Sequence, residues 1–151
     1  MKMKKGTIIL FFLCLLSIFG CTGEDKDTNK DNWKESPTFI HDGKTMYGVE
    51  GKVGIVKENG EEKEPFFPAT QGRLYNISFF EDAKEFYGKE AKITATNQNT
   101  GDTVELAKIR VSSTMSSKLS FNKEGLWKVD ITIEDKPFTS FVIKAEKPIK
   151  K

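Results

Sequence analysis

The sequence predicts an all-β fold, an antiparallel β-sandwich. From Pro37 onward, short runs of alternating apolar and polar residues are separated by turn-forming residues. Such alternation is typical of half-buried antiparallel strands, and no segment has the pattern of a long helix. About six to eight strands at this spacing, in roughly 110 residues, are typical of a sandwich, and an open barrel is the alternative.

Residues 1–20 have the three parts of an export signal. Lys2, Lys4 and Lys5 supply a cationic start, and an uncharged apolar run follows from 7 to 19. Spanning a bilayer of roughly 30 Å takes about 20 residues, so this run is too short to be a transmembrane helix. We therefore expect residues 1–20 to be cleaved as a signal peptide.

The signal ends in Ile18-Phe19-Gly20-Cys21, which resembles the lipobox of bacterial lipoproteins. In that motif an aliphatic residue stands three positions before the cysteine and a small residue stands directly before it. The resemblance implies that Cys21 becomes acylated and holds the chain in the cell membrane at its extracytoplasmic face. An ordinary secretory signal with a chance cysteine and a short uncleaved anchor are the alternatives.

Cleavage would change the charge and the cysteine content. It removes three of 24 basic residues and none of the 22 acidic ones, so the mature net charge is near −1 and gives no argument for nucleic-acid binding. Cys14 leaves with the signal, so Cys21 is the one remaining cysteine. No intramolecular disulfide or thiolate metal cluster is then possible, and we expect no cofactor.

Residues 21–36 form the predicted tether between the lipid and the domain. After Cys21 the segment holds five acids and three lysines, and Trp33 is its one large apolar residue. It cannot bury enough surface to order itself, so we expect a flexible coil of about 20 Å end to end. Trp33 is predicted to pack onto the start of the domain, with an interfacial contact as the alternative. The domain is predicted to span 37–147, followed by a tail at 148–151.

The elements of the domain are predicted from alternation and from turn residues. The first is a short edge strand at 46–49, and a strand at 52–57 ends at Asn59-Gly60, a strong tight-turn signal. A strand at 74–80 places Tyr75, Ile77 and Phe79 on one face, and one or two helical turns follow at 81–87.

Two hairpins complete the domain. Strands at 91–97 and 103–111 flank a turn at 99–102. The clearest strand is 127–134, with Trp127, Val129, Ile131 and Ile133 on one face, and a turn at 135–137 leads to its partner at 138–145.

Residues 125–133 and 137–143 resemble the C-terminal strand pair of an immunoglobulin-like domain, through the pattern Gly-x-Trp-x-Val-x-Ile and a return strand. Together with 47–55 and Met115-Ser116-Ser117, they resemble a family of uncharacterised lipoproteins from Bacillus and its relatives, DUF4871, over about residues 36–147. The resemblance implies an immunoglobulin-like fold and a membrane address, and it implies no activity.

Few residues offer catalytic or metal chemistry. His41 is the sole histidine, so a Ser-His-Asp system would have to use it, and a zinc site would need three or more carboxylates around it. We expect His41 to be a solvent-exposed turn residue instead. No Gly-x-Ser-x-Gly, phosphate-loop or His-Glu-x-x-His motif occurs. We therefore predict no catalytic residues and no metal site.

Acidic residues gather at 58–64 and at Glu81-Asp82, where calcium is conceivable. Calcium loops alternate Asp or Asn ligands around a sharp Gly turn, whereas the acids of the first run are Glu, with Lys57 before them and Lys63 among them. A solvated hairpin tip is the better interpretation of the first cluster, whose acids are Glu58, Glu61, Glu62 and Glu64.

Aromatic residues are the most suggestive feature of the sequence. Seven of them fall between 66 and 87, and strand alternation cannot bury both Phe79 and Phe80 in one core. One of the pair should face outward, or toward the turn at 86–87. Packing under that turn is one interpretation, and an exposed patch for a protein or cell-envelope partner is the other. The candidate surface residues are Phe66, Phe67, Phe80, Phe86 and Tyr87.

These observations favour a non-enzymatic binding or interaction module on a membrane tether. One alternative is an inhibitor of a surface protease, for which 58–67 is the longest candidate loop. Another is a small cell-wall hydrolase with two carboxylates about 5 to 9.5 Å apart, although nothing singles out a pair among 22 acids.

Overall fold

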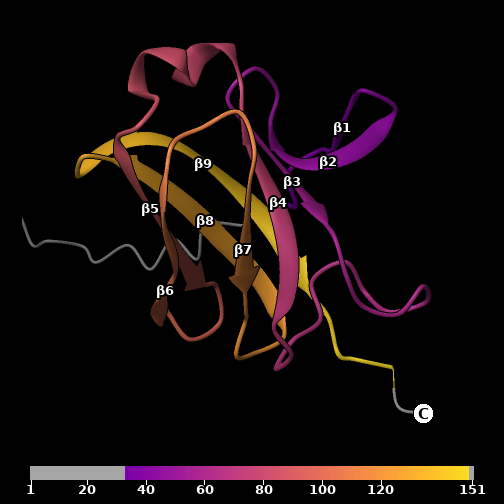
Figure 1. Ribbon diagram of the computed structural model, residues 1–151. Coiled ribbons are helices and arrows are strands. Elements are labelled where there is room, and N and C mark those ends of the chain that lie inside the picture. Colours follow the sequence, from indigo (N-terminus) through magenta and orange to yellow (C-terminus); the bar gives the residue numbers. More distant parts are fainter. Residues whose placement is uncertain (1–32, 150–151) are drawn as a thin grey trace, which may run out of the picture.

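The computed structural model describes residues 33–149, which form two stacked antiparallel sheets and one short 3-10 helix (Figure 1). One sheet has the strand order β1-β2-β3-β4-β7, and the other has the order β6-β5-β8-β9. The chain crosses between the sheets after β4, after β6 and after β7. The predicted all-β antiparallel sandwich is therefore confirmed.

Nine strands and the helix η1 make up the described part of the chain. The five-stranded sheet consists of β1 (Phe39–His41), β2 (Lys44–Val49), β3 (Val53–Lys57), β4 (Arg73–Phe79) and β7 (Met115–Leu119). The four-stranded sheet consists of β6 (Thr103–Arg110), β5 (Glu90–Asn97), β8 (Gly125–Ile133) and β9 (Lys136–Ala145). The helix η1 (Glu81–Phe86) connects β4 to β5.

The seven strands and the helical turn predicted from sequence are all present, with ends shifted by at most two residues. Alternation places the predicted apolar residues inside because successive side chains of a strand point to opposite faces. In β8 these are Trp127, Val129, Ile131 and Ile133, all of which are buried.

The predicted turn at 135–137 is wrong in position. The chain reverses at Glu134 and Asp135, whose φ values of 49° and 65° are those of a two-residue hairpin turn. Pro137 lies inside β9 and pairs with Thr132. A proline is tolerated there because β9 is an edge strand, where a missing N–H costs no ladder hydrogen bond.

Two strands were not predicted, and one predicted edge strand is not at the edge. β2 was expected at the edge of its sheet, but β1 lies outside it and is joined to it by a tight turn at Asp42 and Gly43, with φ values of 48° and 73°. β7 carries three polar residues out of five, so its composition gives no strand signal. Its pairing with β4 defines it as a strand.

The core lies between the sheets. Its polar atoms are satisfied locally: Trp127 Nε1 donates to Lys123 O at 3.0 Å, and the Tyr75 hydroxyl donates to Phe66 O at 2.8 Å. Both bonds remove a desolvation cost that an unpaired buried donor would carry. The largest fully buried side chains are those of Trp127, Tyr75, Phe67, Phe79 and Phe121.

The predicted signal peptide and the acylated Cys21 lie outside the described residues, and of the predicted tether only 33–36 are described. Trp33 is half-buried. Ser36 is joined to β9: its amide donates to Val142 O at 2.9 Å, and its hydroxyl accepts from Val142 N at 2.9 Å. The chain is thus attached one residue earlier than the predicted domain start at Pro37. Between residues 33 and 149 no helix is long and apolar enough to cross a membrane.

Candidate functional site

A groove of about 690 Å³ lies on the outer face of the five-stranded sheet. Its floor contains Val56 from β3 and both Asn76 and Ser78 from β4. These side chains point outward because their neighbours along the two strands point into the core. In the β3–β4 register Val56 pairs with Asn76, and Gly54 pairs with Ser78. Small residues therefore keep the floor low.

The β1–β2 hairpin forms one wall of the groove by folding over this outer face. A Cβ atom at Gly54 would lie 2.5 Å from Met46 Sδ and 3.1 Å from the nearest ring atoms of Phe39 and Phe80. These three side chains thus meet directly above Gly54, and Met46 is buried although it lies on the outer side of the sheet. The glycine is required by this close approach.

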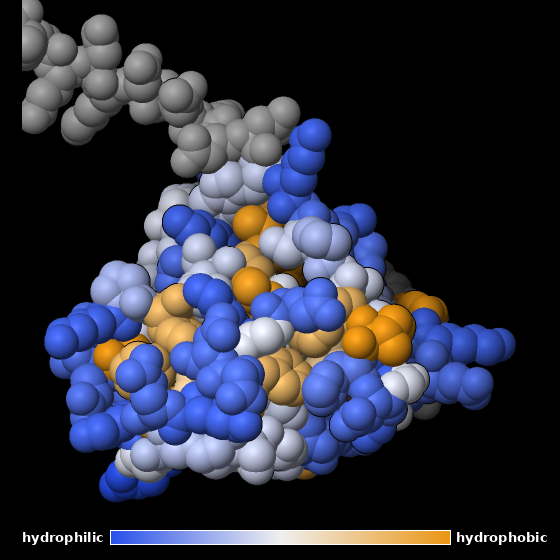
Figure 2. Space-filling model, turned by 90° about the horizontal axis from the view of Figure 1, so that it is seen from above, coloured by the Kyte–Doolittle hydropathy of each residue, from blue (hydrophilic) through white to orange (hydrophobic). Residues whose placement is uncertain are grey.

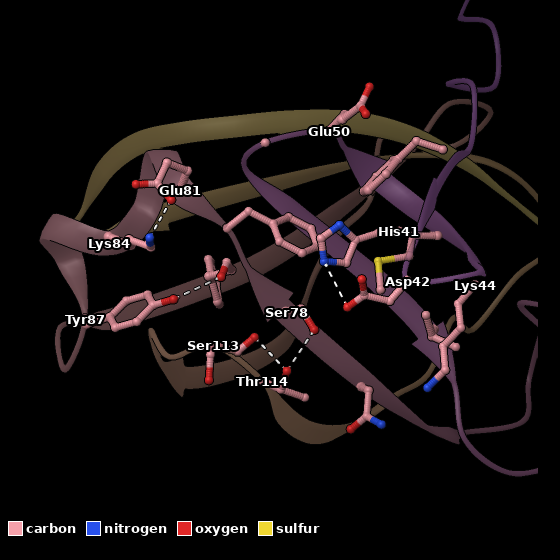
Figure 3. Close-up of a pocket in the computed structure, with 17 residues that line it drawn as sticks. His41, Asp42, Lys44, Glu50, Ser78, Glu81, Lys84, Tyr87, Ser113 and Thr114 are labelled. Carbon is pink, nitrogen blue, oxygen red and sulfur yellow. Dashed lines mark hydrogen bonds and ion pairs between the residues drawn. The ribbon is translucent and has the colours of Figure 1, made fainter.

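His41 and Phe80 form an aromatic platform at the hairpin, and Figure 3 shows the His41 ring at the groove. The His41 ring contacts the Phe80 ring at a tilt of 53°, with 4.5 Å between the ring centroids. Phe39 meets Phe80 edge-on at 6.0 Å. Phe79 is buried in the core and Phe80 is half-buried on the outer side, which confirms the prediction that one of the two faces outward. His41 is exposed as predicted, but it ends β1 and precedes the turn.

Hydroxyl and amide groups line the side of the groove toward β7. The Thr114 hydroxyl donates to Ser113 O at 2.7 Å and lies 3.0 Å from the Ser78 hydroxyl, which leaves Ser78 as the donor of that second bond. Asn76 Oδ1 accepts from Ser116 at 2.9 Å. Within the described residues the amide nitrogen of Asn76 and the hydroxyl of Ser113 have no hydrogen-bond partner in the protein, and both residues line the groove.

Charged groups stand on the rim. His41 Nε2 lies 3.5 Å from Asp42 Oδ2, and Lys84 pairs with Glu81 one helical turn earlier. The side chains of Asp42 and Glu81 are 89% and 76% exposed, so water surrounds them. Glu50 and Lys44 complete the rim. Nowhere in 33–149 do three or more His, Cys, Asp or Glu side chains come together to hold a metal ion.

The five aromatic residues singled out from the sequence fall into separate places. Phe80 and Tyr87 line the groove, where the Tyr87 hydroxyl donates to Phe79 O at 3.2 Å. Phe67 is a core residue, which corrects its assignment to a surface. Phe66 is half-buried and stacks against Tyr47 at 4.2 Å, and Phe86 packs edge-on against Phe138 at 6.0 Å.

The acidic loop between β3 and β4 is not solvated along its whole length. Glu64 is 6% exposed and accepts two hydrogen bonds from Arg73, at 2.7 and 2.8 Å, and one from Lys57 at 3.0 Å. The Arg73 hydrogen bonds lower the pKa of Glu64 to about 2, against the opposing effect of burial. The predicted solvated tip is therefore limited to residues 58–63, and Glu64 anchors the loop from below.

Several residues of the groove were missed from the sequence. Alternation within 74–80 already places Asn76, Ser78 and Phe80 on the face opposite Tyr75, Ile77 and Phe79, so half of the floor was open to prediction. The Asp42-Gly43 pair is a strong hairpin signal and could have revealed β1. Nothing in the sequence shows that this hairpin folds over β3 to meet Phe80.

The fold has a counterpart among solved structures. A structure described as that of a "putative lipoprotein from Bacillus anthracis" superposes with a TM-score of 0.62 at 21% sequence identity, covering 76% of this chain and 87% of that one. The PmoD soluble domain from Methylocystis sp. ATCC 49242 (Rockwell) gives a TM-score of 0.42 at 12% identity, over 66% of this chain and 94% of that one. No family model and no curated protein matches the chain, so the resemblance to DUF4871 stays a prediction.

Proposed function

We propose that this chain is a membrane-anchored extracytoplasmic lipoprotein whose β-sandwich is a binding module without catalytic activity. The groove on the outer face of the five-stranded sheet carries the binding role. Its volume of about 690 Å³ is in the range of ligand sites, and it combines an apolar platform with a few free polar groups, as such sites do.

The proposed address is supported by the N-terminal sequence and by the structural neighbour. Ile18-Phe19-Gly20-Cys21 has the order of a lipobox, and the similar Bacillus anthracis structure is itself described as a "putative lipoprotein". Two or more acyl chains on Cys21 would hold the domain stably, because each buried CH₂ adds about 0.8 kcal/mol.

The absence of catalysis is supported by the surroundings of the groove carboxylates. A carboxylic acid that donates a proton at neutral pH needs an apolar environment or a like-charged neighbour to raise its pKa. Asp42 and Glu81 are instead mostly exposed, and each has a cationic or potentially cationic partner. The exposure of these two carboxylates thus supports the binding module over the paired-carboxylate hydrolase at this groove.

An immunoglobulin-like identity of the module is supported by its strand order. The orders β3-β4-β7 and β6-β5-β8-β9 correspond to strands A-B-E and C′-C-F-G of that architecture. The β1–β2 hairpin is then an addition beside strand A. It supplies one wall of the groove, so the proposed binding site depends on the part of the chain that the basic architecture lacks.

The loop between β3 and β4 supports the protease-inhibitor alternative. Its exposed tip, 58–63, is held rigidly from below by Glu64, and preordered loops are typical of protease inhibitors. Replacing 59–63 by glycine and serine would abolish inhibition of a surface protease if the loop acts in this way. It would leave any binding at the groove unchanged.

Photo-crosslinking in cells tests the groove directly. A benzophenone side chain at Lys44, on the groove rim, should react with a partner in the envelope, whereas one at Lys128, on the outer face of the other sheet, should not. Capture only from Lys128 would contradict the placement of the binding site in the groove. Metabolic labelling with a fatty acid tests the address, because the label should appear on the wild-type chain and be lost in Cys21→Ser.

A further inference from the structure

The backbone of the groove floor is already fully engaged. β3 lies between β2 and β4, and β4 lies between β3 and β7, so both floor strands are internal to their sheet. An extended peptide binds a sheet by pairing with the free backbone groups of an edge strand. No such groups face the groove from β3 or β4, so a ligand on the groove floor is recognised by side chains.

The exposed ring of His41 offers a flat surface to such a ligand. Its side chain is 46% exposed, and the ring is held in place from behind by Phe80 at 4.5 Å. The face of an aromatic ring carries partial negative charge and attracts positively polarised hydrogens. One side of a pyranose ring presents such C–H groups, so it can stack on this platform.

The free polar groups near the platform match hydroxyl chemistry. Asn76 offers two amide donors, Ser113 offers a hydroxyl that both donates and accepts, and Asp42 offers carboxylate acceptors. A sugar ring carries C–H groups on its face and hydroxyl groups around its edge. A ring platform and amide and hydroxyl groups that line one groove are therefore complementary to a sugar.

The charge of the groove points to a neutral ligand. Three carboxylates and two lysines line it, and two of the carboxylates lie beside a cation or a histidine. A polyanion would need an excess of cations, as nucleic-acid sites show. We propose that the groove binds a neutral oligosaccharide of pyranose units, and this inference rests on the binding function proposed above.

Calorimetric titration of the full-length protein in mild detergent tests this inference. The probes are chitotetraose, a linear oligosaccharide of N-acetylglucosamine, and cellotetraose, its glucose counterpart. We expect saturable binding of at least one probe, with a dissociation constant between about 10 μM and 1 mM. Purified peptidoglycan freed of anionic polymers should compete for the same site if the ligand is an envelope glycan.

Two groove variants and two matched controls locate the binding. His41→Ala removes the exposed ring of the platform, and we expect binding to weaken by about tenfold or more. Asn76→Ala removes two donors and should weaken binding by about fivefold. Neither side chain is in the core, so melting temperatures should stay close to that of the wild type. Thr94→Ala and Lys128→Ala, on the outer face of the four-stranded sheet, should change binding by less than about twofold.

The outcomes separate this inference from the proposed function. If neither sugar binds while the Lys44 crosslinker captures a protein, the inferred oligosaccharide ligand is wrong, but the proposed binding function is supported. If neither sugar binds and nothing is captured from Lys44, both the oligosaccharide ligand and the binding function of the groove are wrong. Sugar binding that is unaffected by both His41→Ala and Asn76→Ala would also overturn the inference, since the sugar would then bind elsewhere.

Discussion

The outer faces of the two sheets differ in kind, although the same alternation of side chains produces both. On the four-stranded sheet the outward residues form exposed ion pairs, such as Lys92 with Asp135 and Lys128 with Asp130, each at 3.9 Å. On the five-stranded sheet several outward residues border a groove, among them Val56, Asn76 and Ser78 on its floor. Seen from above, the surface is largely hydrophilic, with apolar residues visible between the hydrophilic ones near the middle and toward both sides (Figure 2).

This difference teaches that a sandwich can specialise one outer face without weakening its core. The inward residues of both sheets pack together in one cluster, which supplies the stability. The outward residues are then free to vary. On the five-stranded sheet the added β1–β2 hairpin covers part of that face, so aromatic residues can be retained there without full exposure.

The largest expected effect comes from the core that both faces share. Trp127→Ala should lower the free energy of unfolding by about 3 to 5 kcal/mol, because it leaves a large cavity and removes the bond from Nε1 to Lys123 O. Urea denaturation followed by circular dichroism measures the loss. An unchanged urea midpoint would contradict the burial of the Trp127 side chain in the core.

Gly54→Val should break the groove face selectively. The added methyl groups would collide with Met46, Phe39 and Phe80, and overpacking of this kind costs about 1 to 3 kcal/mol. Thr94→Val is the control on the outer face of the four-stranded sheet and should leave stability nearly unchanged. Equal losses from both substitutions would mean that the hairpin does not pack over Gly54.

Acid should distinguish the buried ion pairs of the loop from the exposed ones of the four-stranded sheet. The pKa of Glu64 is lowered from 4.5 to about 2, so its contribution is present above pH 4.5 and is lost as the pH falls toward 2. Between pH 6 and pH 3 the wild type should lose about 2 kcal/mol more than Glu64→Gln. Parallel pH profiles for the two proteins, measured by urea denaturation, would show that Glu64 is not held in this way.

The smallest effect is expected on the four-stranded face itself. Lys128→Ala removes an exposed side chain whose ion pair with Asp130 is long. The free energy of unfolding should therefore change by no more than about 0.5 kcal/mol, with a correspondingly small shift in melting temperature. Differential scanning calorimetry would detect a larger shift, which would show that this face is also specialised.

The strands with strong alternation were predictable because burial selects every second residue. The predicted faces of 74–80 and 127–134 are those found in β4 and β8. β7 was not predictable, since its polar composition carries no burial signal and its strand state depends on pairing with β4. Glu64 was misjudged for the same reason: its partner Arg73 is nine residues away and only the folded loop brings the two charges together.

The sequence by itself determined the all-β class, the inward residues of the main strands and the outward direction of one of Phe79 and Phe80. These follow from local geometry, because a strand's alternation is set by its own backbone. Only the tertiary structure decided which outward residues form a site. His41, Met46 and Asn76 come from three different strands, and their juxtaposition depends on how the β1–β2 hairpin curves over β3, a long-range packing that no local pattern encodes.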